Sequence, residues 1–261
     1  QMMNIFNLSF GKDSMATLLL ALEKGIQIDH VMYVDIRFSP EISGEHPLMA
    51  EWIPTAEKRL KEKFGIVVEH VYSGVSFVEQ FYKVKQKGNH VGDIYGFPYV
   101  VGAWCNSMLK VAAIQKYLKQ FDTFTQFIGI AYDEPVRWER MLKKETDMRK
   151  FRSLLVENRL TEQDAFRICD RYGLLSPMYK TEDGIFRGGC WFCPKQCYSG
   201  IYDLWKNYPE LYTKLLQIEP DSHNTFKPGI TLQELAERFE NGYIPKRRKK
   251  RVTNEQLRLE V

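Results

Sequence analysis

The feature that most constrains the fold is an alternation of short apolar segments with longer amphipathic ones along the first half of the chain. An apolar run at 4–10 is followed by residues 13–24, where Met15, Leu18 and Leu22 recur at helical spacing. The same pattern predicts further strands at 30–36, 66–71 and 124–131, and further helices at 47–64 and 99–121. Strands that alternate with helices of this length indicate a parallel sheet with helices on both faces.

Several residues predict where helices begin and break. Thr161 starts one expected helix, and Thr231 with Glu234 has the spacing of a capping box before another. Pro54 is expected to kink or divide the helix that contains it, because proline lacks a backbone N–H and its ring crowds the preceding turn.

After residue 145 the alternation gives way to shorter helical segments around a group of cysteines. This later part is too small to fold alone, so we expect it to be an appendage of the sheet. We therefore predict an α/β protein with a Rossmann-like parallel sheet in residues 1–150. Residues 151–261 are predicted to form a small, mostly helical region with a cysteine knuckle.

The composition suits a globular protein with a sizeable core, since 44% of the residues are hydrophobic and 27% are charged. No apolar run approaches the roughly 20 residues of a membrane-spanning helix, and the opening residues do not resemble a signal peptide. We expect a cytoplasmic protein with reduced thiols and no membrane partner. The six cations from Lys246 to Arg251 predict either a contact with nucleic-acid phosphates or a solvated tail.

The first expected strand leads into its helix through the run Ser9-Phe10-Gly11-Lys12-Asp13-Ser14. Such a turn directs backbone N–H groups and the positive end of the helix at an anion. Gly11 permits close approach, Lys12 supplies charge, and the hydroxyls of Ser9 and Ser14 are donors for phosphate oxygens. Asp13 is a candidate ligand for a Mg²⁺ ion that bridges the phosphates. The spacing matches neither the Walker nor the dinucleotide motif, and a polar turn without a ligand is the alternative.

Asp35 ends the second expected strand. The carboxyl edge of such a sheet is where ribose or adenine groups are usually held. Asp35 is therefore a second candidate contact for a nucleotide.

Three cysteines, Cys190, Cys193 and Cys197, lie within one short loop. Thiolates select zinc or iron–sulfur clusters over magnesium or calcium, and the Cys-Pro pair at 193–194 is typical of the end of cluster-binding runs. We predict an iron–sulfur centre, with zinc as the alternative. Cys169 is expected in the core because it lies on an apolar helix stripe, and His223 is a weaker candidate ligand in a polar turn.

In their order along the chain, these motifs resemble the PP-loop ATP pyrophosphatase superfamily, and within it the phosphoadenosine phosphosulfate (PAPS) reductase-like family. The turn at 9–14 is similar to the family's Ser-Gly-Gly-x-Asp-Ser, although Phe10 departs at the second position. A second similar segment, at 128–137, matches the family at Gly129, Glu134 and Arg137. It departs from the family at Ala131 and Pro135. Without the resemblance, Glu134 and Arg137 have the i,i+3 spacing of a surface ion pair.

A third segment, from Trp104 to Lys110, is similar to the family's cysteine-containing segment that ends in Leu-Lys. The resemblance implies that Cys105 is the fourth ligand of the cluster and that Lys110 belongs to the nucleotide site. It covers roughly residues 4–200 and implies an adenine nucleotide alpha hydrolase-like fold. The implied ligand is ATP or an adenylyl sulfate-type nucleotide.

Three functions are compatible with these residues. The first is an ATP-dependent sulfur transferase that adenylates an acceptor and receives sulfur from a donor protein. In this enzyme Lys12 and Asp13 would be the catalytic residues. Its acceptor is a nucleobase in tRNA or DNA, or a small molecule. The second is a reductase of adenylyl sulfate or its 3′-phosphorylated form, for which the resemblance implies a mobile C-terminal cysteine; the chain has none after Cys197. The third is a non-catalytic zinc- and nucleotide-binding module. We favour the first.

Overall fold

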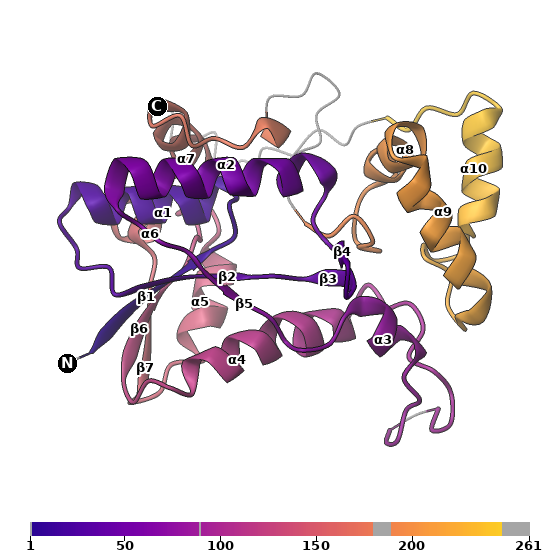
Figure 1. Cartoon of the computed structure of the whole chain (residues 1–261), viewed down its shortest axis with the longest axis horizontal. Helices are drawn as coiled ribbons and strands as arrows, with labels where there is room; N and C mark the ends of the chain where they lie inside the picture. The colour runs from indigo at the N-terminus through magenta and orange to yellow at the C-terminus, as the bar shows by residue number, and fades with distance from the viewer. Residues whose placement is uncertain (1, 89, 180–188, 247–261) are drawn as a thin grey trace. The chain divides into compact units, whose positions relative to one another are not determined.

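The apolar segments form a five-stranded parallel sheet with the strand order β5-β2-β1-β6-β7 (Figure 1). The strands are β1 (Met3–Leu8), β2 (His30–Val34), β5 (Glu69–Val71), β6 (Phe124–Phe127) and β7 (Arg149–Arg152). The central strand β1 pairs in parallel with β2 on one side and with β6 on the other. A Rossmann-like α/β fold is thereby confirmed. The computed structural model describes residues 2–88, 90–179 and 189–246.

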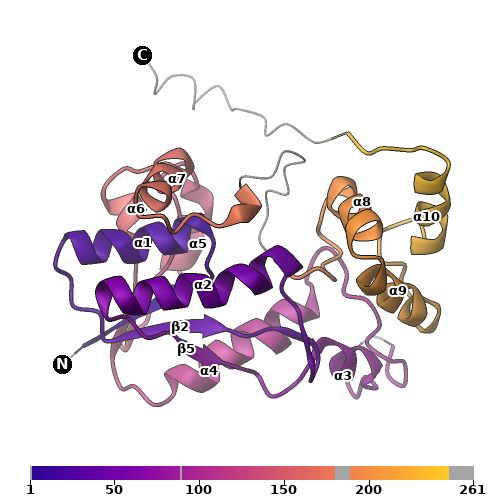
Figure 2. The same cartoon turned by 45° about the horizontal axis from the view of Figure 1, so that its top comes forward.

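Helices cover both faces of this sheet (Figures 1 and 2). One face carries α1 (Lys12–Glu23), α2 (Pro47–Phe64), α6 (Leu154–Glu157) and α7 (Glu162–Arg171), and the other carries α4 (Ala112–Leu118) and α5 (Pro135–Leu142). Neighbouring residues of a strand point to opposite faces. Phe6 of β1 accordingly packs in the core beneath α1 and α2, whereas Ile5 packs in the core beneath α4.

The helix α2 has the predicted bounds, but it runs without interruption through Pro54, so the expected division is wrong. Pro54 is exposed, and water can therefore bond the carbonyl that loses its partner at the proline. Trp52, Ile53 and Leu60 are buried on the opposite side. Packing of this apolar face supplies most of the stability of a helix, so one missing hydrogen bond is tolerated.

The helix expected over 99–121 is shorter than predicted. A π-helical segment, Asn106–Val111, precedes α4, which ends at Leu118. Gly102 adopts a φ of 71°, a left-handed conformation that an α-helix does not contain. The glycine therefore stops the helix from extending toward Tyr99.

The edge strand β7 was not predicted from the sequence. It pairs in parallel with β6, for example Phe124 with Arg149. Its sequence, Arg-Lys-Phe-Arg, offers a single apolar residue, and a charged edge strand has no strong period-two signal. The sheet therefore continues past the expected boundary at residue 150.

The chain divides into two compact units, which do not follow a single boundary. The first contains residues 1–79 and 105–190, and the second contains 80–104 and 191–261. The sheet and the helices described above belong to the first unit. It also contains the short strands β3 (Arg37–Ser39) and β4 (Ile42–Ser43) and the 3₁₀ turn Pro177–Tyr179.

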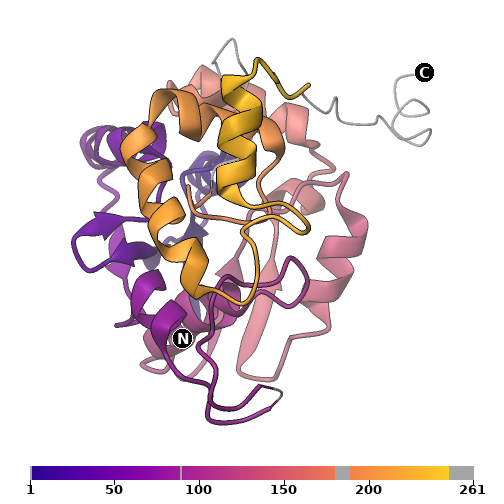
Figure 3. The same ribbon diagram turned by 90° about the vertical axis from the view of Figure 1, so that its right-hand side faces the viewer.

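The second unit is mainly helical, with α8 (Tyr198–Asn207), α9 (Pro209–Ile218) and α10 (Leu232–Glu240), drawn in orange to yellow in Figure 3. The 3₁₀ turn Glu219–Asp221 follows α9, and α3 (Phe77–Tyr82) spans the change from the first unit to the second. The capping box predicted at Thr231 is present. The helix expected to start at Thr161 is also present, and it begins with a capping box that was not predicted. Among the described helices, none is both long and apolar enough to cross a membrane.

Candidate functional site

The turn between β1 and α1 is closed by hydrogen bonds of its own serines. The hydroxyl of Ser14 donates to the Gly11 carbonyl at 3.0 Å and accepts the N–H of Ser9 at 3.0 Å. The Ser9 hydroxyl lies 3.0 Å from the same oxygen, and it is the donor there because Ser14 has given its proton to Gly11. Both hydroxyls thus shape the turn itself. Donation from either to a phosphate stays a prediction.

The conformation of Phe10 shows how the turn accommodates a residue other than glycine at this position. Its φ is 54°, in the left-handed region that favours glycine and costs other residues about 1–2 kcal/mol. The ring is fully buried and makes an edge contact with Tyr33, with 5.2 Å between ring centroids. Burial of the phenyl ring offsets the backbone strain. The turn thereby keeps a glycine-like backbone without the glycine.

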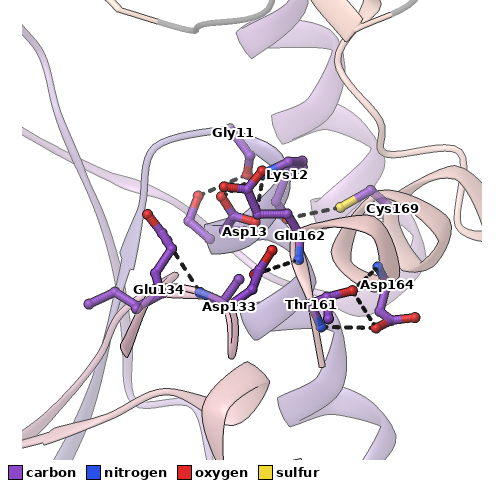
Figure 4. Close-up of polar contacts among 12 residues, drawn as sticks. Gly11, Lys12, Asp13, Asp133, Glu134, Thr161, Glu162, Asp164 and Cys169 are labelled. Atoms are coloured by element: carbon purple, nitrogen blue, oxygen red, sulfur yellow. Dashed lines mark hydrogen bonds and ion pairs between the residues drawn. The ribbon is translucent and has the colours of Figure 1, made fainter. Parts of the chain in front are cut away.

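Lys12 and Asp13 form a partly buried charge cluster at the first turn of α1 (Figure 4). The Lys12 ammonium lies 2.9 Å from both Asp13 oxygens and 3.6 Å from Glu162 of α7. Burial lowers the pKa of Lys12, but these carboxylates outweigh burial and raise it above its ordinary value. Burial raises the pKa of Asp13, against the opposing effect of Lys12. The site therefore holds a lysine that is positively charged at neutral pH.

Two side chains that are distant in sequence hold the Lys12 backbone from either side. The Lys12 N–H donates to the Tyr179 hydroxyl at 3.2 Å, and the Cys169 thiol donates to the Lys12 carbonyl at 3.1 Å. Burial raises the pKa of Cys169 to about 12, so the thiol keeps the proton that this bond needs. Cys169 is fully buried, which confirms its predicted core position. Tyr179 was not predicted, because no local pattern joins it to the turn.

Gly129 brings the loop after β6 against the start of α1. A Cβ atom at Gly129 would lie 2.3 Å from the Ser14 nitrogen and 2.5 Å from the Asp13 carbonyl carbon. Only glycine fits at this position, because real Cβ atoms do not approach backbone atoms so closely. The segments 9–14 and 128–137, which the sequence analysis joined only by resemblance, therefore touch.

Glu134 lies at the end of this loop, and its charge raises the pKa of Asp13. Its carboxylate accepts the Ala131 N–H at 3.4 Å and pairs with Arg137 at 2.9 Å. Arg137 is exposed, so the i,i+3 ion pair anticipated as an alternative is present. The neighbouring Asp133 accepts the Glu162 N–H at 3.1 Å, which links this loop to the start of α7.

The other two candidate nucleotide contacts, Asp35 and Lys110, lie on separate segments of the first unit. Asp35 follows β2 at the carboxyl edge, and its carboxylate accepts hydrogen bonds from Arg37 at 2.7 Å. Lys110 is an exposed residue of the π-helical segment. Burial raises the pKa of Glu45, and the charge of Lys110 acts in the opposite direction on the same group. Nucleotide contacts by Asp35 and Lys110 stay predictions.

The four cysteines proposed as ligands are divided between the two units. Cys105 and Cys190 belong to the first unit and Cys193 and Cys197 to the second, and none of these four described cysteines is in a disulfide. Within the described parts of the chain, no three His, Cys, Asp or Glu side chains are gathered as a group able to hold a metal ion. The donor chemistry suits zinc or iron, whereas the assembled ligand set stays a prediction.

Cys197 is positioned at the N-terminus of α8. Its sulfur lies 3.0 Å from the Ser199 hydroxyl. Burial raises the pKa of Cys197, but hydrogen bonds from Ser199 and from the backbone N–H groups at the helix start outweigh burial and lower it. In the same unit His223, the weaker candidate ligand, stacks on His90 with 6.3 Å between the ring centroids.

No protein-family model matches the chain. The chain is 23% identical over 257 residues to an uncharacterized 37.8 kDa protein from the gpa 5′ region of Escherichia phage 186. The aligned part covers 83% of this chain and 74% of that protein. Among solved structures it is similar to U34-tRNA thiolase NcsA from Methanococcus maripaludis with its 4Fe-4S cluster. The TM-score is 0.41 at 17% identity, over 96% of this chain and 84% of that chain. Membership of the PP-loop superfamily stays a prediction that rests on the motifs.

Proposed function

We propose that the chain binds the phosphates of ATP at the turn 9–14, adenylates an acceptor with release of pyrophosphate, and supports sulfur transfer to that acceptor. The observation that supports this most is the contact of Gly129 with the first turn of α1. Through it, the two segments that resemble those of PP-loop enzymes meet at the end of the central strand. The family segment that 128–137 resembles has a glycine at this position, and the packing shows why no larger residue fits there.

The residues of the turn have the charge that this reaction needs. The N-terminus of α1 carries the positive end of the helix dipole, which favours an anion. The Lys12 ammonium has three donors, so it can keep one bond to Asp13 and donate others to a phosphate. An acceptor oxygen would attack the α-phosphorus, and pyrophosphate would leave. A sulfur nucleophile would then displace AMP. Catalysis is by positioning and charge neutralisation.

Magnesium and an iron–sulfur centre belong to the same proposal. The carboxylates of Asp13 and Glu134 are oxygen donors of the kind that Mg²⁺ prefers. The thiols of Cys105, Cys190, Cys193 and Cys197 would hold the iron–sulfur centre, with zinc as the alternative. Such a centre would supply a site at which sulfur is carried or activated.

A nucleobase in tRNA or DNA is the acceptor that we favour, because six consecutive cations follow the last helix. Of these only Lys246 lies within the described residues. The sulfur donor would be a separate protein.

Equilibrium binding of ATP, followed by product analysis in the presence of fractionated cell RNA, tests the proposal. We expect AMP and pyrophosphate from the wild-type chain, and loss of ATP binding in Lys12→Ala. Lys24→Ala is the matched control, since Lys24 is an exposed lysine at the other end of the same helix. Equal ATP affinity of Lys12→Ala and wild type would remove the turn from the site. Sulfite released from adenylyl sulfate would instead support the reductase.

A further inference from the structure

The loop from Cys193 to Cys197 is held in one conformation by hydrogen bonds within the second unit. The Gln196 N–H donates to the Cys193 carbonyl at 3.1 Å, which closes a turn between the two cysteines. The Gln196 side chain donates to the carbonyl of the buried Trp191 at 2.9 Å. These bonds determine the turn but leave two of its carbonyls, those of Pro194 and Gln196, for another partner.

Lys227 is that partner, although it lies some thirty positions further along the chain. Its ammonium donates to the Pro194 carbonyl at 2.7 Å and to the Gln196 carbonyl at 2.6 Å. The same ammonium lies 5.5 Å from the centroid of the Tyr198 ring. Charged donors make stronger hydrogen bonds than neutral ones, so the two bonds clamp the loop on both sides of its middle residue.

The backbone of Lys227 is itself held by hydrogen bonds. The Lys227 carbonyl accepts the Thr225 hydroxyl at 2.5 Å and the Ile230 N–H at 3.2 Å. The preceding residue, Phe226, is buried and stacks edge-on against Phe97. Because the backbone is already ordered, only the side chain loses conformational freedom when the ammonium binds the loop carbonyls.

The ammonium also brings positive charge to the thiols. Burial lowers the pKa of Lys227, and negative charge on Cys193 and Cys197 acts in the opposite direction. Thiolates bound to a metal are anionic, and a cation that is bonded to the loop carrying them offsets their mutual repulsion. A neutral side chain of the same length would provide the packing without this charge.

We propose that Lys227 is the positioning residue of the cysteine loop: it clamps the loop through the Pro194 and Gln196 carbonyls and so keeps Cys193 and Cys197 placed as metal ligands. This inference rests on the proposed function, because it assigns Lys227 to the proposed thiol centre. Partners that orient metal ligands typically change metal affinity about 10- to 100-fold when they are removed.

The test compares the full chain with Lys227→Met, Lys227→Arg and Lys206→Met, all purified anaerobically. Methionine keeps most of the length of lysine but has neither donors nor charge, and arginine keeps the charge. Lys206 is the matched control: it is an exposed lysine of the same unit whose ammonium lies 5.9 Å from the Tyr202 ring. The readouts are iron and zinc content, the rate of metal loss to a chelator, and amide hydrogen exchange of peptides that cover residues 193–200.

We expect Lys227→Met to lose its metal at least tenfold faster than wild type, Lys227→Arg to recover much of the difference, and Lys206→Met to match wild type. The Gln196 amide should lose its exchange protection only in Lys227→Met. Equal metal loss and equal protection in all four chains would overturn the inference. A wild-type chain with neither iron nor zinc would refute the proposed metal centre, and the exchange of the Gln196 amide would still decide whether Lys227 holds the loop.

Discussion

The contact of Gly129 with the turn 9–14 allows a sharp prediction for Gly129→Ala. The added methyl group would lie 2.3 Å from the Ser14 nitrogen, and the three atoms nearest to it all belong to the backbone of Asp13 and Ser14. Ordinary contact begins at 3.4 Å, so the loop and the helix must separate by about 1 Å. A side chain cannot rotate to relieve this clash, since only main-chain atoms are involved. Overpacking of this kind costs about 1–3 kcal/mol of the free energy of unfolding.

The separation should reach the ligand as well as the core, because the displaced atoms carry the N–H groups of the turn. We expect Gly129→Ala to lower ATP affinity at least tenfold, which corresponds to about 1.4 kcal/mol. Denaturant unfolding measures the stability, and equilibrium dialysis with labelled ATP measures the affinity.

Gly65→Ala separates a general loss of stability from damage to the turn. Gly65 ends α2 with a φ of 69°, and a Cβ there meets nothing within 4 Å. Alanine is strained at such a φ by about 1–2 kcal/mol, so this variant should lose comparable stability and keep its ATP affinity. If Gly129→Ala bound ATP as tightly as Gly65→Ala, the turn would not be the phosphate site.

Three further predictions concern Tyr179, Cys169 and Asp164. Tyr179→Phe removes the acceptor of the N–H at the start of α1 and should lower the free energy of unfolding by about 1 kcal/mol, measured by urea denaturation; no change would show that water replaces the hydroxyl. Because the pKa of Cys169 is raised to about 12, its thiol should resist iodoacetamide at pH 8 in the folded chain while denaturation exposes it, as mass spectrometry of the peptides can record. Hydrogen bonds from Thr161 outweigh burial and lower the pKa of Asp164. Its stabilisation is therefore complete at neutral pH and is lost as the pH falls below about 4, and Thr161→Ala should flatten that acid limb of the stability curve.

The local signals of the sequence predicted most of the sheet and the place of the turn. Helical spacing in 13–24 and the Gly11-Lys12 pair needed no knowledge of distant residues, because both patterns lie within a few residues of each other. The capping box at Thr231 was predicted for the same reason. The strand β7 escaped prediction, since its charged edge residues form no apolar period. The two units do not meet at residue 150, because α6 and α7 pack in the core of the sheet and Phe97 packs against Phe226. Both are contacts between distant segments, which local patterns do not record.

The sequence by itself determined a parallel α/β sheet, a polar turn at the end of its first strand, and a set of thiols suited to a soft metal. Periodicity and residue type carry those properties, and both are local. Only the tertiary structure decided what surrounds each feature. Tyr179 and Cys169 hold Lys12 from 167 and 157 residues away, and Lys227 reaches the cysteine loop from a separate turn. Such pairs form because the packing of distant segments brings single atoms together, and no spacing along the chain records that geometry.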